Sequence, residues 1–106
     1  MDERRRIKVR KLLAPDSQPI GRPGRRRKSI RVVQGGTEAA RELLRKLEAL
    51  GEKEELTGYD GISINLGGKD RVGLRERSGS GEPTMDVTIS YVPEVWKIKF
   101  EQGDLG

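Results

Sequence analysis

The side chains best suited to chemistry lie in the stretch Asp70–Asp86, which reads DRVGLRERSGSGEPTMD. In its first half Arg71, Arg75 and Arg77 are separated by four and by two positions. They therefore fall on the same face of an extended chain, a spacing typical of a half-exposed strand. A loop of small and helix-breaking residues follows, and a second alternating run then carries Asp86 among its polar positions. Two strands therefore flank a loop, with arginines on one strand and a carboxylate on the other. If the chain performs chemistry, we expect it here.

The absence of two residue types narrows what that chemistry can be. The 106 residues include no histidine and no cysteine. This excludes imidazole acid–base catalysis, Ser-His triads, thiolate zinc sites and disulfides. There is also no apolar run of the roughly 18 residues that a membrane span needs, and no apolar segment of a secretory signal near the N-terminus. We therefore expect neither a membrane anchor nor a signal peptide in this chain.

One amphipathic helix is the most regular element in the sequence. Thr37 is suited to cap its first turn, and Gly51 stands where a C-terminal cap is expected. Its apolar stripe has five members at helical spacing: Ala40, Leu43, Leu44, Leu47 and Leu50. We interpret these side chains as core rather than as a groove for a partner.

Short alternating runs predict the strands that pack on this helix. They are Ser29–Val33, Ile62–Leu66, Arg71–Arg77, Met85–Tyr91 and Val95–Phe100. The apolar faces of the last four runs, with Trp96, Ile98 and Phe100 together on the last of them, should meet the leucine stripe. The sequence thus predicts an α+β fold in which one main helix packs on a four- to five-stranded antiparallel sheet. The other face of that sheet is polar and locally basic, and it is either functional or merely solvated.

The positive charge of the chain is concentrated in residues 1–28. This segment holds 11 of the 22 lysines and arginines and three acids, whereas residues 29–106 are slightly acidic. With three prolines and few apolar residues, residues 1–28 are expected to form a disordered basic arm or linker before a domain over 29–106. Such an arm could contact a nucleic-acid backbone, or it could be a solvated spacer.

Four short segments then follow one another in a suggestive order. They are Arg71–Arg75 (RVGLR), Ser78–Gly81 (SGSG), Pro83–Val87 (PTMDV) and Lys97–Phe100 (KIKF). Their order resembles the C-terminal toxin domains of bacterial polymorphic toxins, the variable tips of Rhs-repeat and contact-dependent inhibition proteins. The resemblance covers roughly Ile30 to Phe100. It departs from the family pattern at one turn, where Gly-Gly-Lys-Asp stands in place of Pro-Asp-Gly.

The resemblance implies a metal-independent ribonuclease of the barnase and colicin type, without a cofactor. Cleavage of RNA by its own 2′-hydroxyl requires a base and stabilisation of a charged phosphate. Without histidine, Asp86 or Glu76 is the candidate base. The full set of candidate catalytic residues is Arg75, Arg77, Thr84, Asp86 and Lys97. The candidate substrate-binding residues are Lys69, Arg71, Ser78, Ser80 and Lys99. The same residue types also form structural salt bridges.

The resemblance further implies where the domain acts and what it meets. The expected substrate is RNA, either tRNA or rRNA, in the cytoplasm of a competitor cell. The domain would reach that cell as part of a larger secreted effector, and a cognate immunity protein would neutralise it. The alternative is a non-catalytic nucleic-acid-binding module that uses its basic arm. A third reading is a small interaction protein with an incidental basic tail.

Overall fold

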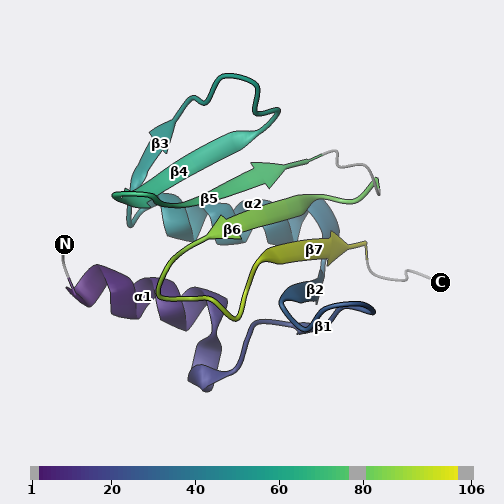
Figure 1. The fold of residues 1–106 in the computed structure, drawn as a ribbon. Helices are drawn as coiled ribbons and strands as arrows, with labels where there is room; N and C mark the ends of the chain where they lie inside the picture. Colours follow the sequence, from purple (N-terminus) through teal and green to yellow (C-terminus); the bar gives the residue numbers. More distant parts are fainter. Residues whose placement is uncertain (1–2, 77–80, 103–106) are drawn as a thin grey trace.

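The computed structural model describes residues 3–76 and 81–102 and shows an α+β fold (Figure 1). Its seven strands form one sheet in the order β1-β2-β7-β6-β5-β4-β3. All neighbouring strands are antiparallel except β2 and β7. The elements are α1 (Glu3–Leu13), η1 (Pro15–Ser17), β1 (Arg22–Pro23), β2 (Ile30–Gln34), α2 (Gly36–Glu48), β3 (Glu52–Glu54), β4 (Ile62–Gly67), β5 (Asp70–Arg75), β6 (Thr84–Thr88) and β7 (Lys97–Glu101). The predicted fold class is confirmed, but the sheet is larger than predicted.

The two additional strands are short and lie at the edges of the sheet. β1 contains Pro23, which an edge strand tolerates because it needs no ladder donor on its outer side. β3 consists of Glu52, Lys53 and Glu54, and it pairs with β4 through its backbone. Neither strand has an alternating apolar pattern, which explains why the sequence did not reveal them.

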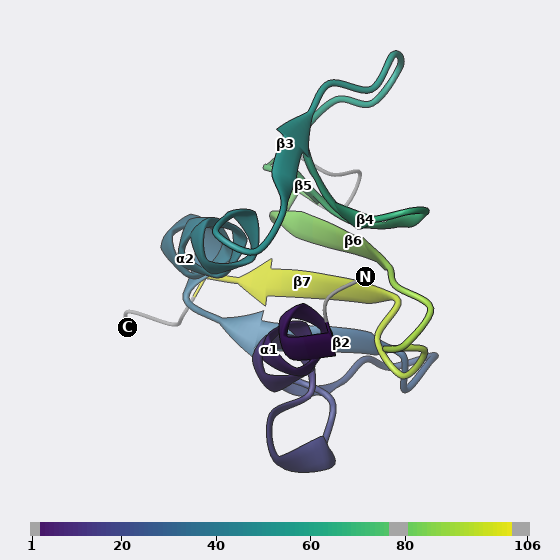
Figure 2. The ribbon, with the colours of Figure 1, turned by 90° about the vertical axis from the view of Figure 1, so that its left-hand side faces the viewer.

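Both helices contribute to a single core with the sheet. α2 supplies the predicted leucine stripe, of which Leu47 is fully buried, and α1 adds Val9 and Leu13. The sheet contributes the apolar phases of its central strands, ending with Ile98 and Phe100 on β7. Figure 2 views both helices nearly end-on; α2 packs against β7 and β2, and α1 packs against α2. Within the described residues, neither helix is long and apolar enough to cross a membrane.

The prediction of a disordered arm over residues 1–28 is wrong for the part of it that the structure describes. Val9 and Leu13 lie one helical turn apart in α1 and are fully buried, and Leu12 packs against the same core. Polar anchors complete the docking. Arg5 donates to the Leu66 carbonyl at 3.0 Å, and Arg10 donates to the Tyr91 carbonyl and to the Glu94 carboxylate.

Arg31 holds the segment that follows α1 against the sheet. Its side chain is nearly buried, at 7% exposure, and each hydrogen bond of its guanidinium to a described residue goes to a backbone carbonyl. Nε donates to Ile20 and Nη1 to Lys28, both at 2.8 Å, while Nη2 donates to Gly21 at 3.1 Å and to Pro19 at 3.4 Å. A planar fork of donors is suited to this arrangement, because one side chain reaches two separate stretches of chain.

The structure also corrects the predicted position of Trp96. Ile98 and Phe100 face the core as expected, but Trp96 is 45% exposed. β7 begins only at Lys97, and Val95 occupies the buried position before it. The Trp96 amide donates to the Ser29 carbonyl, which fixes the chain in this phase. The alternation therefore does not extend back to Trp96.

Candidate functional site

The face of the sheet opposite the helices, called the open face below, carries most of the predicted site residues. Side chains alternate between the two faces along each strand, so the strand register decides which of them meet. Gly73, Asp86 and Lys97 form one row across β5, β6 and β7. Arg75 lies in the next row, together with Thr84 and Lys99.

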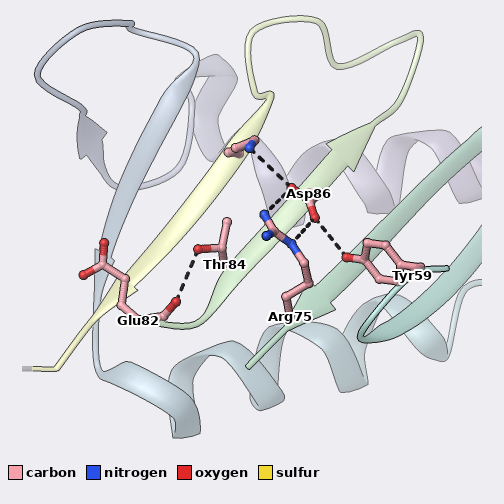
Figure 3. A network of polar contacts seen from close by, with 6 residues as sticks. Tyr59, Arg75, Glu82, Thr84 and Asp86 are labelled. Carbon is pink, nitrogen blue, oxygen red and sulfur yellow. Dashed lines mark hydrogen bonds and ion pairs between the residues drawn. The ribbon is translucent and has the colours of Figure 1, made fainter. Parts of the chain in front are cut away.

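Asp86 is the centre of a polar cluster on this face (Figure 3). Arg75 donates to it twice, from Nε to Oδ2 at 2.8 Å and from Nη2 to Oδ1 at 3.1 Å. The Tyr59 hydroxyl donates to Oδ2 at 2.9 Å, and the Lys97 ammonium lies 3.9 Å from Oδ1. We call these four residues the Asp86 cluster. The side chains of Arg75, Asp86 and Lys97 are 26 to 30% exposed, so a ligand can reach them.

Tyr59 is the member of the cluster for which the sequence pattern predicted no site role. It lies in the connection between β3 and β4, and its ring crosses the sheet above Gly73. A Cβ atom at Gly73 would lie 2.3 Å from the Tyr59 hydroxyl oxygen, so only glycine leaves room for the ring. A glycine inside a strand often marks such a close approach, and this was the available signal.

The surroundings of Tyr59 favour its neutral form. Partial burial of the ring raises the pKa of the Tyr59 phenol above its usual value, and the hydrogen bond to Asp86 raises it further. The phenol therefore remains a hydrogen-bond donor at physiological pH. The same carboxylate raises the pKa of the Arg75 guanidinium through its hydrogen bonds. Asp86 is thus held by two groups that keep their protons.

The Asp86 cluster combines a carboxylate with neighbouring positive charge. A carboxylate offers about four acceptor positions, and Arg75 and Tyr59 together use three of them. Among the contacts between described residues, this leaves one position to accept a proton or a hydrogen bond from a ligand hydroxyl. Lys97 and Arg75 provide charge that could stabilise an adjacent phosphate. The arrangement is suited to a base beside a phosphate site.

Two other candidates lie on the open face but make different contacts. Thr84 stands directly opposite Arg75, but it is buried and its hydroxyl donates to the Glu82 carbonyl at 3.3 Å. The hydroxyl proton of Thr84 is therefore engaged in a hydrogen bond within the turn. Arg71 lies one row beyond Gly73, and its Nε is 3.5 Å from the Glu54 carboxylate.

The structure separates Lys69 and Glu76 from the Asp86 cluster. Lys69 lies in the turn between β4 and β5, at the opposite end of β5 from Arg75. Glu76, the second candidate base, accepts two hydrogen bonds from Arg41 of α2, at 2.7 and 3.0 Å. These bonds lower the pKa of Glu76 and draw it towards the helix. Arg77, Ser78 and Ser80 lie outside the described residues.

The open face also includes cations from the segment predicted to be disordered. A pocket of about 380 Å³ lies over the apolar side chains of Ile30 and Val32. Its charged lining consists of Arg22, Arg25, Arg26, Glu82, Lys99 and Glu101. We call it the arginine pocket. Of the predicted residues only Lys99 belongs to it, because the sequence placed the arginines on a free arm.

In the described part of the chain, no group of three or more Asp or Glu side chains is arranged to hold a metal ion. Comparisons with known protein families, with curated proteins and with solved structures find no match to this chain.

Proposed function

We propose that this chain is a metal-independent ribonuclease, the C-terminal toxin domain of a bacterial polymorphic toxin, which cleaves RNA on its open face. The observation that supports this proposal is the Asp86 cluster, in which a solvent-accessible carboxylate keeps one acceptor position beside two cations. The chain has no histidine, so a carboxylate is the base available there.

The proposed reaction needs three actions from the protein. The Asp86 carboxylate accepts the proton of a ribose 2′-hydroxyl, and the 2′-oxygen then bonds to the adjacent phosphorus. The bond from phosphorus to the 5′-oxygen breaks, which leaves a 2′,3′-cyclic phosphate and a 5′-hydroxyl. Arg75 and Lys97 stabilise the charge that develops on the phosphate. The Lys97 ammonium, 3.9 Å from Oδ1 of Asp86, protonates the departing 5′-oxygen.

Tyr59 acts as a positioning residue in this scheme. Its hydroxyl donates to Oδ2 of Asp86, the same oxygen that accepts from Arg75 Nε. Two donors on one oxygen fix the plane of the carboxylate and direct its remaining acceptor position. Removal of the phenol should lower the cleavage rate less than removal of the base.

A second function is favoured by a different property of the same cluster. Two parallel hydrogen bonds join Arg75 to Asp86, as in many purely structural ion pairs. With the arginine pocket beside it, the open face could then bind nucleic acid without cleaving it. Such binding would weaken steeply as salt concentration rises.

The decisive experiment compares Asp86→Asn with Glu54→Gln, a matched change of another carboxylate on the open face. Purified variants are incubated with single-stranded RNA in excess EDTA, and the product ends are identified. We expect cyclic-phosphate products from wild type and from Glu54→Gln, and none from Asp86→Asn. Binding by wild type without cleavage would favour the second function. Cleavage by Asp86→Asn at the wild-type rate would refute the role of Asp86.

The proposal also includes a partner and a place of action. An immunity protein that protects the producing cell would cover the open face, and acidic side chains would complement the arginine pocket. The domain would travel within a larger secreted effector and act in the cytoplasm of the target cell. Co-expression with a small acidic protein encoded next to the toxin gene would test this, since growth should recover.

A further inference from the structure

Trp96 is a large aromatic side chain that the proposed reaction does not use. It is 45% exposed and lies immediately before β7. Two cations contact its ring: the Lys97 ammonium lies 4.8 Å from the ring centroid, and the Arg27 guanidinium carbon lies 5.3 Å from it. An indole exposed to this extent, with cations against it, presents an aromatic surface within a positively charged environment.

The position of Trp96 connects the two features of the open face. Lys97 contacts both the Trp96 ring and the Asp86 carboxylate, so the ring adjoins the Asp86 cluster. On the other side, Arg27 belongs to the same connection between β1 and β2 as Arg25 and Arg26, which line the arginine pocket. The base, the aromatic ring and the pocket therefore lie along one continuous surface.

We propose that Trp96 is the stacking platform for a base of single-stranded RNA and that the arginine pocket holds a neighbouring phosphate of the same strand. This inference deepens the proposed function and rests on it, because it names the form of RNA that the open face accepts. Bases in a duplex are stacked on each other and cannot reach an indole, whereas an unpaired base can. Stacking of a base on an aromatic ring is sequence-tolerant and stronger than a solvent-exposed cation–π contact.

The charges around the ring favour RNA over a protein partner. Arg22, Arg25 and Arg26 line the arginine pocket, and Lys99 is also a cation of its lining. One of the two carboxylates there, Glu101, is already paired with Arg22 at 2.8 Å. When a base stacks on Trp96, the long side chains of Arg27 and Lys97 can turn towards the phosphates on either side of it. Single-stranded RNA carries a phosphate and a base at every nucleotide. It therefore complements a surface on which cations lie beside an exposed aromatic ring.

The test uses the fact that Trp96 is the only tryptophan of the chain. Its fluorescence is measured while a single-stranded 2′-O-methyl RNA of about eight nucleotides is added, a probe that cannot be cleaved through its 2′-position. The same sequence as a duplex is the comparison. We expect saturable quenching by the single strand and much weaker quenching by the duplex.

Variants then assign the effect to the ring and to the pocket. Binding of a labelled probe, followed by fluorescence anisotropy, should weaken about 5- to 150-fold in Trp96→Ala and only slightly in Trp96→Phe, which keeps a stacking ring. Arg26→Ala should reduce the salt dependence of binding. Lys46→Ala, an exposed cation on α2, is the matched control and should bind as wild type does.

Several results would overturn the inference, and they differ from those that would overturn the proposed reaction. Three results would reject the stacking role. They are cleavage of RNA with unchanged Trp96 fluorescence, an affinity of Trp96→Ala for the probe equal to that of wild type, and binding of the duplex as tight as that of the single strand. Binding of an acidic partner protein alone, with no nucleic acid bound, would also reject it. Conversely, quenching by the single strand with no cleavage of ordinary RNA would reject the reaction and keep the inference.

Discussion

Arg75 and Asp86 are joined by two parallel hydrogen bonds although they do not stand opposite each other in the sheet. The register places Arg75 opposite Thr84, and Asp86 opposite Gly73. The guanidinium therefore reaches diagonally across the two strands. Because Gly73 has no side chain, the space above it is free for Tyr59, which approaches the same carboxylate.

The diagonal pair should contribute little to stability and much to activity. Arg75→Ala, Asp86→Asn and the double variant form a cycle in which the coupling energy is expected to be about 1 kcal/mol, since the pair is neither fully exposed nor buried. Cleavage of RNA should fall to background in each single variant. Urea denaturation measures the coupling. A coupling of several kcal/mol, with cleavage retained in a folded single variant, would identify a purely structural pair.

Gly73→Ala should disturb the cluster without touching any charged group. The new methyl group would lie 2.3 Å from the Tyr59 hydroxyl oxygen, so the ring must move and lose its bond to Asp86. We expect a loss of about 1 kcal/mol in the free energy of unfolding. In a Tyr59→Ala background the same change should cost almost nothing or stabilise β5, because alanine suits a strand better than glycine.

If Gly73→Ala costs the same with and without the Tyr59 ring, then the ring does not need the space above Gly73. Chemical denaturation of wild type, Gly73→Ala, Tyr59→Ala and the double variant decides between these results. The RNA cleavage rates of the same four proteins give an independent readout of the position of Asp86.

The sequence was sufficient for the parts of the fold with strong periodicity. The leucine stripe of α2, the alternating runs of β4 to β7 and the shared face of Arg75 and Asp86 all follow from spacing alone. These elements bury enough apolar surface that the pattern and the packing agree. The placement of Arg75 and Asp86 on one face of the sheet was therefore predicted correctly.

The features that escaped prediction depend on polar contacts between distant segments. Arg31 fixes residues 19–21 and 28 through carbonyls, which have no sequence signature. Tyr59 lies in a charged connection without periodicity, and its role depends on the glycine below it. Trp96 was placed in the core because alternation was extended one residue beyond the strand. Such contacts are decided by tertiary geometry.

Alkaline pH should reveal the hydrogen bond between Tyr59 and Asp86. Burial and this bond raise the pKa of Tyr59 in the folded chain above the ordinary value of about 10. Above about pH 10 the unfolded chain loses the phenol proton first, so the unfolded state binds fewer protons and stability falls as pH rises. Below that pH the contribution of the protonated Tyr59 phenol to stability is fully present.

Tyr59→Phe should therefore show a shallower loss of stability above about pH 10 than wild type. Burial also raises the pKa of Tyr91, so Tyr91→Phe should lessen the slope as well, and it serves as the comparison for a buried phenol that does not bond to Asp86. Thermal melting followed by circular dichroism at several pH values gives the slopes. An equal slope for wild type and Tyr59→Phe would show that the phenol has no special environment.

Leu13→Ala should destabilise the whole domain, because this side chain is fully buried between α1 and the rest of the core. We expect a loss of about 2–5 kcal/mol, the usual cost of a large-to-small change in a core. Ile7→Ala on the same helix is the control; this side chain is 49% exposed and should cost about 0.5 kcal/mol or less. Similar costs for both variants in urea denaturation would show that α1 is not docked.

Arg31→Lys should release the segment between α1 and β2 although the charge is unchanged. The guanidinium serves four carbonyls from two stretches of chain, and a single ammonium cannot reach all of them. We expect a loss of about 2–4 kcal/mol in the free energy of unfolding, because carbonyls in a nearly buried site would be left without a donor. Arg25→Lys, at an exposed position of the same segment, should cost almost nothing.

The same variant links the fold to the arginine pocket. Arg22, Arg25 and Arg26 are placed by the segment that Arg31 holds, so its release should scatter their charges. We expect Arg31→Lys to bind single-stranded RNA several-fold more weakly at a temperature where it remains folded, whereas Arg25→Lys keeps most of the affinity. If Arg31→Lys were destabilised but bound RNA as wild type does, the arginines would act as a free cationic arm rather than as a built pocket.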